Sequence, residues 1–153
     1  MAIEIERKFL VQGNDWRVAP AVFYSQGYLS RDKARTVRVR IAGDEAFLTI
    51  KGQSVGASRA EFEYPIPVTD ARALLAMCEQ PLIEKYRRKI AYEGFIWEVD
   101  EFLGENLGLV VAEIELPAED TVFAHPAWLG QEVTDDVRYF NSNLARHPFS
   151  RWE

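Results

Sequence analysis

The chain has 153 residues, of which 48% are hydrophobic and 27% are charged, a composition that is ordinary for a folded globular protein. Its net charge of −6 argues against a general nucleic-acid-binding protein, because such proteins need a basic face for phosphate contacts. Cys78 is the single cysteine and there are two histidines. An intrachain disulfide and the usual zinc sites made of His and Cys are therefore excluded.

The length fits one domain over residues 1–153, which is long enough to bury a core. No apolar run approaches the roughly 20 residues of a membrane-spanning helix, and the first residues lack the pattern of a signal peptide. We therefore expect a cytoplasmic protein with neither a membrane nor a nucleic acid as partner, while a homodimer stays open.

The first segment, residues 3–10, predicts a strand with two different faces. Glu4, Glu6 and Lys8 share one face, because successive side chains of a strand point in opposite directions. Apolar side chains such as Ile5 occupy the other face. The strand is therefore apolar on one side and charged on the other.

Seven further segments predict strands, and most of them alternate in the same way. They lie at residues 23–30, 36–42, 46–51, 59–67, 83–91, 95–102 and 109–116. Gly27 indicates a bulge or a close approach within its strand, and Gly43 and Gly94 indicate turns.

One segment between the predicted strands has apolar residues at helical spacing. Residues 70–80 predict a helix, with Thr69 as the N-cap and Pro81 at its end. The last stretch is predicted to be helical or irregular, with caps at Thr134 and Asn141.

The polar faces of the strands are chemically selective. Acidic residues repeat on some strands and basic residues on others, as in Glu61-x-Glu63 and Arg38-x-Arg40. One such face would be an ordinary solvent face, but its recurrence along the chain favours a shared interior. Eight strands can close into a barrel that holds a small ligand. The predicted fold class is α+β, mainly β: a closed eight-stranded antiparallel barrel, or tunnel, with a charged interior and helices packed outside.

The interior charges indicate what fills the tunnel, because an unpaired buried ion costs several kcal/mol. Arg makes bidentate contacts with phosphate oxygens and Lys supplies a point charge. The candidate polyanion contacts are Lys8, Arg38, Arg40, Lys51, Lys85 and Arg87. Carboxylates suit a hard divalent cation such as Mg²⁺ or Mn²⁺. The candidate metal ligands are Glu4, Glu6, Asp100, Glu113 and Glu115.

These motifs, in this order, resemble the CYTH superfamily, or triphosphate tunnel metalloenzymes, and the likeness covers nearly the whole chain. The length and the ending are most similar to the short bacterial branch that acts chiefly on inorganic triphosphate. The matching motifs are Glu4-x-Glu6-x-Lys8, residues 26–29, Arg38-x-Arg40, residues 48–51, Glu61-x-Glu63, Lys85-x-Arg87, Asp100, Glu113-x-Glu115, and residues 128–134 and 138–142.

The resemblance implies a role for each matching residue. Glu4, Glu6 and Glu115 would be the main metal ligands, assisted by Asp100 and Glu113. The phosphates would be bound by Lys8, Arg38, Arg40, Lys51, Lys85, Arg87 and Arg138. For Glu61 and Glu63 three roles stay open: a second metal site, the positioning of water, or a balance of the basic strands. Glu98 and Lys89 also lie on the inward phase and are as well explained by a structural role.

The predicted reaction is in-line attack of a metal-activated water on a terminal phosphorus, with the basic residues stabilising the developing charge. Tyr28 could face Lys8. A free phenol is a poor base near neutrality, but a nearby ammonium favours the phenolate. The Lys8–Tyr28 pair is therefore a candidate general base, and packing of Tyr28 at the tunnel wall is the equal alternative.

Three functions compete. The first is a metal-dependent hydrolase of inorganic triphosphate. The second is a nucleoside or thiamine triphosphatase or a class IV adenylate cyclase, each of which needs a pocket for an organic group. The third is a non-catalytic polyphosphate- or nucleotide-binding module. The complete carboxylate set argues against the third, because a polyanion binder gains little from acidic groups.

Overall fold

The computed structural model describes residues 2–152, so Met1 and Glu153 lie outside the described part. Nine strands and two α-helices make up most of this range. The strands are β1 (Ala2–Val11), β2 (Ala21–Ser30), β3 (Arg35–Ala42), β4 (Glu45–Gly52), β5 (Ser58–Pro65), β6 (Ile83–Tyr92), β7 (Phe95–Phe102), β8 (Val110–Glu115) and β9 (Leu129–Glu132). The helices are α1 (Val68–Met77) and α2 (Asn141–Arg146).

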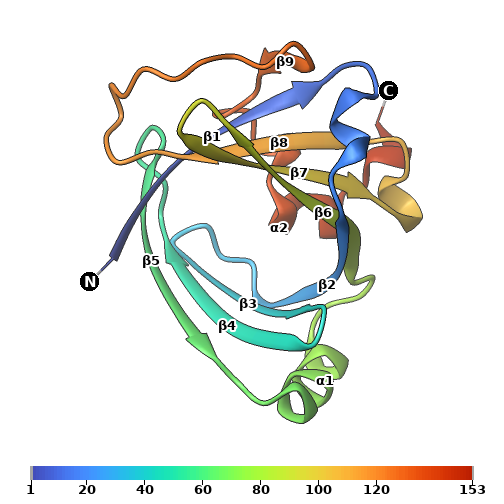
Figure 1. Cartoon of the computed structure of the whole chain (residues 1–153). Helices are drawn as coiled ribbons and strands as arrows, with labels where there is room; N and C mark the ends of the chain where they lie inside the picture. Colours follow the sequence, from blue (N-terminus) through green and yellow to red (C-terminus); the bar gives the residue numbers. More distant parts are fainter. Residues whose placement is uncertain (1, 153) are drawn as a thin grey trace.

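Eight strands close into a ring in which every pair is antiparallel. The order is β5-β4-β3-β2-β6-β7-β8-β1, and an additional pairing of β5 with β1 completes the circle. In Figure 1 the curved wall of β3, β4 and β5 faces β1, β7 and β8 across the ring. The predicted eight-stranded antiparallel tunnel is therefore confirmed.

Short turns set the registers of two hairpins. Tyr92 pairs with Phe95 across the turn Glu93-Gly94, in which both residues have positive φ values, 48° and 85°. Such a two-residue turn matches the twist of the flanking strands. Gly43, at φ 62°, plays the same role between β3 and β4.

The ninth strand, β9, was not predicted from the sequence. It is four residues long and pairs with the second half of β1, where Phe9 lies opposite Glu132. So short a segment has too few positions to show alternation.

The helices differ from prediction at their ends. α1 begins at Val68, one residue before the predicted Thr69 cap, because the Ala71 N–H already donates to the Pro67 carbonyl. It ends before Cys78, whose backbone is extended, rather than at Gln80. No helix begins at Thr134 in the described chain, and α2 begins at Asn141 itself after an extended Phe140.

Apolar residues cover the outside of the ring. α1 packs over β2, β3 and β4 through Ala71 and Leu75, which meet Val39. Gly27 allows this contact, because a Cβ at this position would lie 2.8 Å from Cys78 Cβ and 2.7 Å from Leu82 Cδ2. Of the two alternatives for Gly27, the close approach is confirmed. Gly27 itself pairs in register with Val39, and the register shift of this strand lies farther on, between Tyr28 and Ser30.

The C-terminal segment closes one end of the ring. Inward-facing positions become apolar there, at Ile83, Phe102 and Val111, and they pack against Tyr139 and Leu144 in one buried cluster. Figure 1 shows α2 behind β6 and β7. The polar interior therefore ends against an apolar core. No helix in the described part is long and apolar enough to span a membrane.

Candidate active site

A cavity of about 300 Å³ lies inside the ring, and all eight strands contribute to its wall. Most of the predicted site residues meet there. They are Glu4, Glu6, Lys8, Tyr28, Arg38, Arg40, Lys51, Glu61, Glu63, Arg87, Glu113 and Glu115, and Lys89 and Glu98 join them. The wall does not include Lys85, Asp100 or Arg138.

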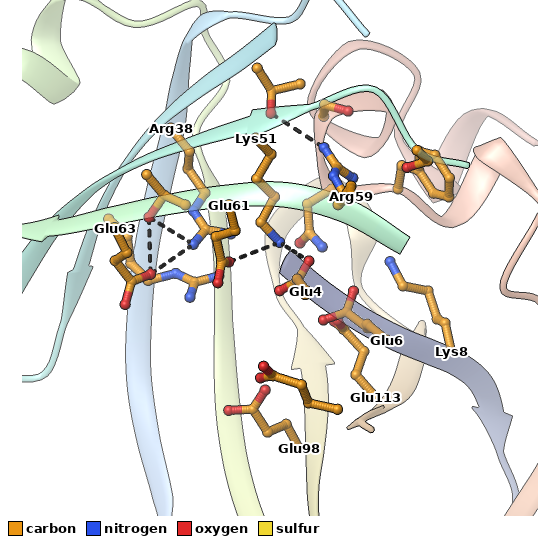
Figure 2. Close-up of a pocket in the computed structure, with 18 of the residues that line it drawn as sticks. Glu4, Glu6, Lys8, Arg38, Lys51, Arg59, Glu61, Glu63, Glu98 and Glu113 are labelled. Carbon is orange, nitrogen blue, oxygen red and sulfur yellow. Dashed lines mark hydrogen bonds and ion pairs between the residues drawn. The ribbon is translucent and has the colours of Figure 1, made fainter. Parts of the chain in front are cut away.

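Carboxylates gather along β1, β7 and β8. Figure 2 shows Glu4 and Glu6 beside each other, with Glu113 close to Glu6. Burial, followed by the negative charge of Glu113, raises the pKa of Glu6 well above its usual value. Burial likewise raises the pKa of Glu4, and burial with the charges of Glu4 and Glu98 raises that of Glu115. These carboxylates repel one another, and a cation between them would remove that cost.

This donor set fits a hard divalent cation. Among residues 2–152 no three acidic, His or Cys side chains converge closely enough to form a ready-made cation site. Mg²⁺ commonly uses one or two carboxylates and takes its other ligands from water and substrate phosphates. Neighbouring pairs such as Glu6 and Glu113 meet that need without a preformed cage.

Lys51 and Arg38 are balanced by carboxylates on neighbouring strands. Lys51 Nζ lies 2.8 Å from Glu4 Oε1 and 3.4 Å from Glu61 Oε2, as Figure 2 shows. Burial alone would lower the pKa of Lys51, but Glu6 and Glu4 outweigh it and raise the value. Arg38 Nη2 lies 3.7 Å from Glu63 Oε2. Glu61 and Glu63 thus act here as counter-ions of the basic strands.

Arg40 is a buried cation that forms no ion pair with any carboxylate among residues 2–152. Its Nε donates to Gln26 Oε1 at 2.8 Å, and its guanidinium lies 4.9 Å from the centre of the Tyr24 ring, which Arg87 also approaches at 4.8 Å. Burial and the nearby charges of Arg38 and Arg87 lower the pKa of Arg40 to about 9. A polyanion in the cavity would relieve this crowding.

Lys85 and Asp100 form an ion pair behind the wall. Lys85 Nζ lies 2.7 Å from Asp100 Oδ2, and the two side chains are 0% and 1% exposed. Arg87 donates to the same carboxylate. Both Asp100 oxygens therefore accept hydrogen bonds from cations. These contacts orient Arg87 toward the cavity.

Lys8 and Tyr28 both line the cavity. Lys8 Nζ donates to the Tyr139 carbonyl at 3.1 Å and lies 5.4 Å from the centre of the Phe140 ring. Tyr28 is 6% exposed and also belongs to the cluster that closes the ring. The pair thus lies where the polar cavity meets the apolar C-terminal segment.

Arg138 lies away from these residues. Its side chain is 57% exposed and its Nη2 lies 2.6 Å from Asp136 Oδ2. It also covers the rings of Tyr139 and Trp152. The structure thus places Arg138 on the outside of the segment that closes the ring.

Several residues of the wall were not predicted from sequence, among them Arg59 and four residues of the C-terminal segment. Arg59 lines the cavity, and its shared phase with Glu61 and Glu63 on β5 was a usable signal. The C-terminal segment adds Thr134, Phe140, Asn141 and Ser142. No strand periodicity marks these residues, because they lie outside the strands, but all four fall in the matching motifs at residues 128–134 and 138–142.

Comparison with known proteins agrees with this geometry. The profile of the CYTH domain matches residues 2–148. The chain belongs to the CYTH family. Its ring of antiparallel strands around a charged cavity is thus the CYTH domain of this protein.

Known proteins are similar to this chain over most of their length. An inorganic triphosphatase of Acetivibrio thermocellus is 54% identical, with 100% of this chain and 99% of the relative covered. An inorganic triphosphatase of Nitrosomonas europaea is 40% identical, with 93% and 96% covered. A crystal structure of an inorganic triphosphatase superposes with a TM-score of 0.65 at 37% identity and covers 95% of each chain.

Proposed function

We propose that this CYTH protein hydrolyses a phosphoanhydride bond of inorganic triphosphate and depends on a divalent metal ion. The observation that carries the proposal is the close packing of carboxylates and basic side chains around one cavity. Carboxylates alone would repel a polyphosphate, and a site that only bound the polyphosphate through basic side chains would not need carboxylates. The similarity to two inorganic triphosphatases supports this substrate over an organic triphosphate.

Glu4, Glu6, Glu113 and Glu115 would hold the metal ion, which we propose to be Mg²⁺ or Mn²⁺. When bound, the ion supplies charge neutralisation and an activated water. Asp100 would act indirectly, since its oxygens hold Lys85 and Arg87.

The phosphate chain would lie against the basic wall of Lys8, Arg38, Arg40, Lys51 and Arg87. These side chains would stabilise the charge that develops on the transferred and leaving phosphates. We place Lys85 behind this wall, as a support for Arg87, and Arg138 outside it. Tyr28, together with Lys8, would take the proton of the attacking water.

Phosphate release tests the proposal. The purified protein is incubated with triphosphate, pyrophosphate, ATP or thiamine triphosphate, each with Mg²⁺, Mn²⁺ or EDTA. We expect metal-dependent release from triphosphate above the others. Tight triphosphate binding without turnover would indicate a binding module, and cyclic AMP from ATP would indicate a cyclase.

Glu4→Gln and Glu6→Gln test the metal assignment. Both variants should lose metal-dependent activity while keeping the far-UV circular dichroism of the fold. Glu84→Gln is the matched control, because Glu84 is an exposed residue of β6 that does not line the cavity. Activity retained in both cavity variants would remove these ligands from the proposal. The homodimer and the cytoplasmic location stay predictions.

A further inference from the structure

Arg59 is a cavity cation that lies beside the candidate metal ligands. It lies opposite Glu4 in the register of β5 with β1, on the same strand phase as Glu61. Figure 2 shows Arg59 beside Lys51, facing the side of the cavity that holds Glu4 and Lys8. The Glu6 N–H donates to the Ala57 carbonyl at 3.1 Å, so the chain just before Arg59 is fixed to β1.

The guanidinium of Arg59 is largely unpartnered. Its one hydrogen bond in the described chain runs from Nη2 to Thr36 Oγ1 at 3.4 Å, and its Nε is buried without an acceptor. A guanidinium has five N–H donors, and leaving a buried donor unpaired costs free energy. Most of the binding capacity of Arg59 is therefore unused in the protein alone.

The cavity cations differ in their counter-ions. Lys51, Arg38 and Arg87 each have a carboxylate within 4.0 Å. Within residues 2–152, the buried or half-buried cavity cations Lys8, Arg40 and Arg59 form no such ion pair. An anion that enters the cavity can bind these three without first displacing a carboxylate.

Arg59 and Arg40 reach the cavity from separated points of the wall. Thr36, the partner of Arg59, precedes Arg40 by four residues on β3, which corresponds to about 13 Å along an extended strand. Lys51, opposite Thr36, and Arg38 lie between them in the sheet. A linear polyanion must therefore be long enough to engage both Arg40 and Arg59.

We propose that Arg59 binds the phosphate group farthest from Arg40 and thereby makes the cavity select triphosphate over pyrophosphate. This inference rests on the proposed function and deepens it. Arg suits the role because its planar fork binds phosphate oxygens in a bidentate way. Pyrophosphate, bound at the Arg40 end, would leave Arg59 unused.

Arg59→Gln tests the proposal through binding and turnover. Calorimetry with triphosphate and with pyrophosphate, both in EDTA so that the metal-dependent hydrolysis contributes no heat, should show triphosphate affinity falling about ten- to a hundredfold, since a charge-assisted contact is lost. Pyrophosphate affinity should stay within about twofold, so the ratio between the two affinities collapses. Arg59→Lys should keep an intermediate ratio, because one ammonium replaces the bidentate fork.

Two further variants make the result specific. Arg40→Gln should lower the affinity for both anions. Arg72→Gln, on the exposed face of α1, should change neither affinity. If Arg59→Gln lowered the affinities for triphosphate and pyrophosphate equally, or left their ratio unchanged, the inference would be overturned. A wild-type protein that binds triphosphate but releases no phosphate would instead contradict the proposed function, and the binding ratio would still decide the role of Arg59.

Discussion

Arg87 binds Asp100 in a bidentate ion pair: its Nε and Nη2 donate to Oδ1 and Oδ2 at 2.7 and 2.8 Å. Both side chains are buried, and Lys85 contacts the same carboxylate. One negative charge thus holds two cations of β6. Such a cluster stabilises the protein only while it is complete, because removing one partner leaves buried charge uncompensated.

Asp100→Asn should therefore lower the free energy of unfolding by about 3–5 kcal/mol, measured by urea denaturation. Glu101→Gln is the control, since Glu101 pairs with Arg17 and Arg88 on the outer face and should cost at most about 1 kcal/mol. An Asp100 variant as stable as the control would contradict the role of the buried cluster.

Asp100 also predicts a pH dependence of stability. Burial raises its pKa, but Arg87 and Lys85 outweigh burial and lower it below the usual value. A carboxylate whose folded pKa is depressed contributes stability above its unfolded pKa of about 3.9 and loses it as the pH falls through the folded pKa. Acid denaturation of the wild type should show this loss. Asp100→Asn should lack that component.

Arg40→Gln should separate stability from binding. The pKa of Arg40 is lowered to about 9 by burial and by Arg38 and Arg87, so its charge is unfavourable at neutral pH while the cavity holds no anion. The variant should melt at the same or a higher temperature than the wild type. Added triphosphate should raise the melting temperature of the wild type much more than that of the variant. A variant that melts at a lower temperature than the wild type, and that triphosphate stabilises as much as the wild type, would contradict this role of Arg40.

Tyr28→Phe tests the general base. If Tyr28 takes the proton of the attacking water, kcat should fall by about 10²–10⁴-fold. The tyrosine also packs in the apolar cluster that closes the ring, and phenylalanine preserves that packing. Unchanged turnover across pH would leave Tyr28 with the packing role alone.

Thr134 links the outer face of β1 to the cavity. Arg7 binds Glu132 at 2.7 and 2.9 Å, Thr134 Oγ1 donates to Glu132 Oε2, and the Lys8 N–H donates to Thr134 Oγ1. Thr134→Val keeps the shape but removes the hydroxyl, so we expect kcat/KM for triphosphate to fall about tenfold through displacement of Lys8.

Thr134→Ser should restore that activity, because the hydroxyl returns. Thr121→Val is the control, since its hydroxyl accepts a hydrogen bond from Ala118 outside the cavity. Thr134→Val with wild-type kcat/KM would show that this chain of hydrogen bonds does not position Lys8.

Gly27→Ala should destabilise the contact of α1 with β2. A Cβ would lie less than 3.0 Å from Cys78 and Leu82, and overpacking of this kind costs about 1–3 kcal/mol. Thermal unfolding should show the loss. Gly27→Ala should cost less in a Leu82→Ala background than in the wild type, because that substitution removes Leu82 Cδ2, which would lie 2.7 Å from the new Cβ. Equal stability of Gly27→Ala and the wild type would contradict the close approach.

Local patterning determined much of this protein. Alternation along each strand assigned Glu4, Arg38 and Glu113 to one face, because the period of a strand is two whatever its neighbours are. Turn residues such as Gly43 and Gly94 then delimited the hairpins. The eight strands, the single long helix and most of the cavity wall follow from these short-range rules.

The tertiary structure decided which inward residues meet the cavity. Asp100 and Lys85 share the inward phase with Glu98 and Arg87, but they lie where the apolar C-terminal cluster begins and bind each other instead. Arg59 became a site residue through its pairing with Glu4, a contact between β5 and β1. Strand phase is a local property, whereas depth in the ring depends on registers and on packing between segments far apart in the chain. The charges of the tunnel were therefore readable from sequence, and their partners were not.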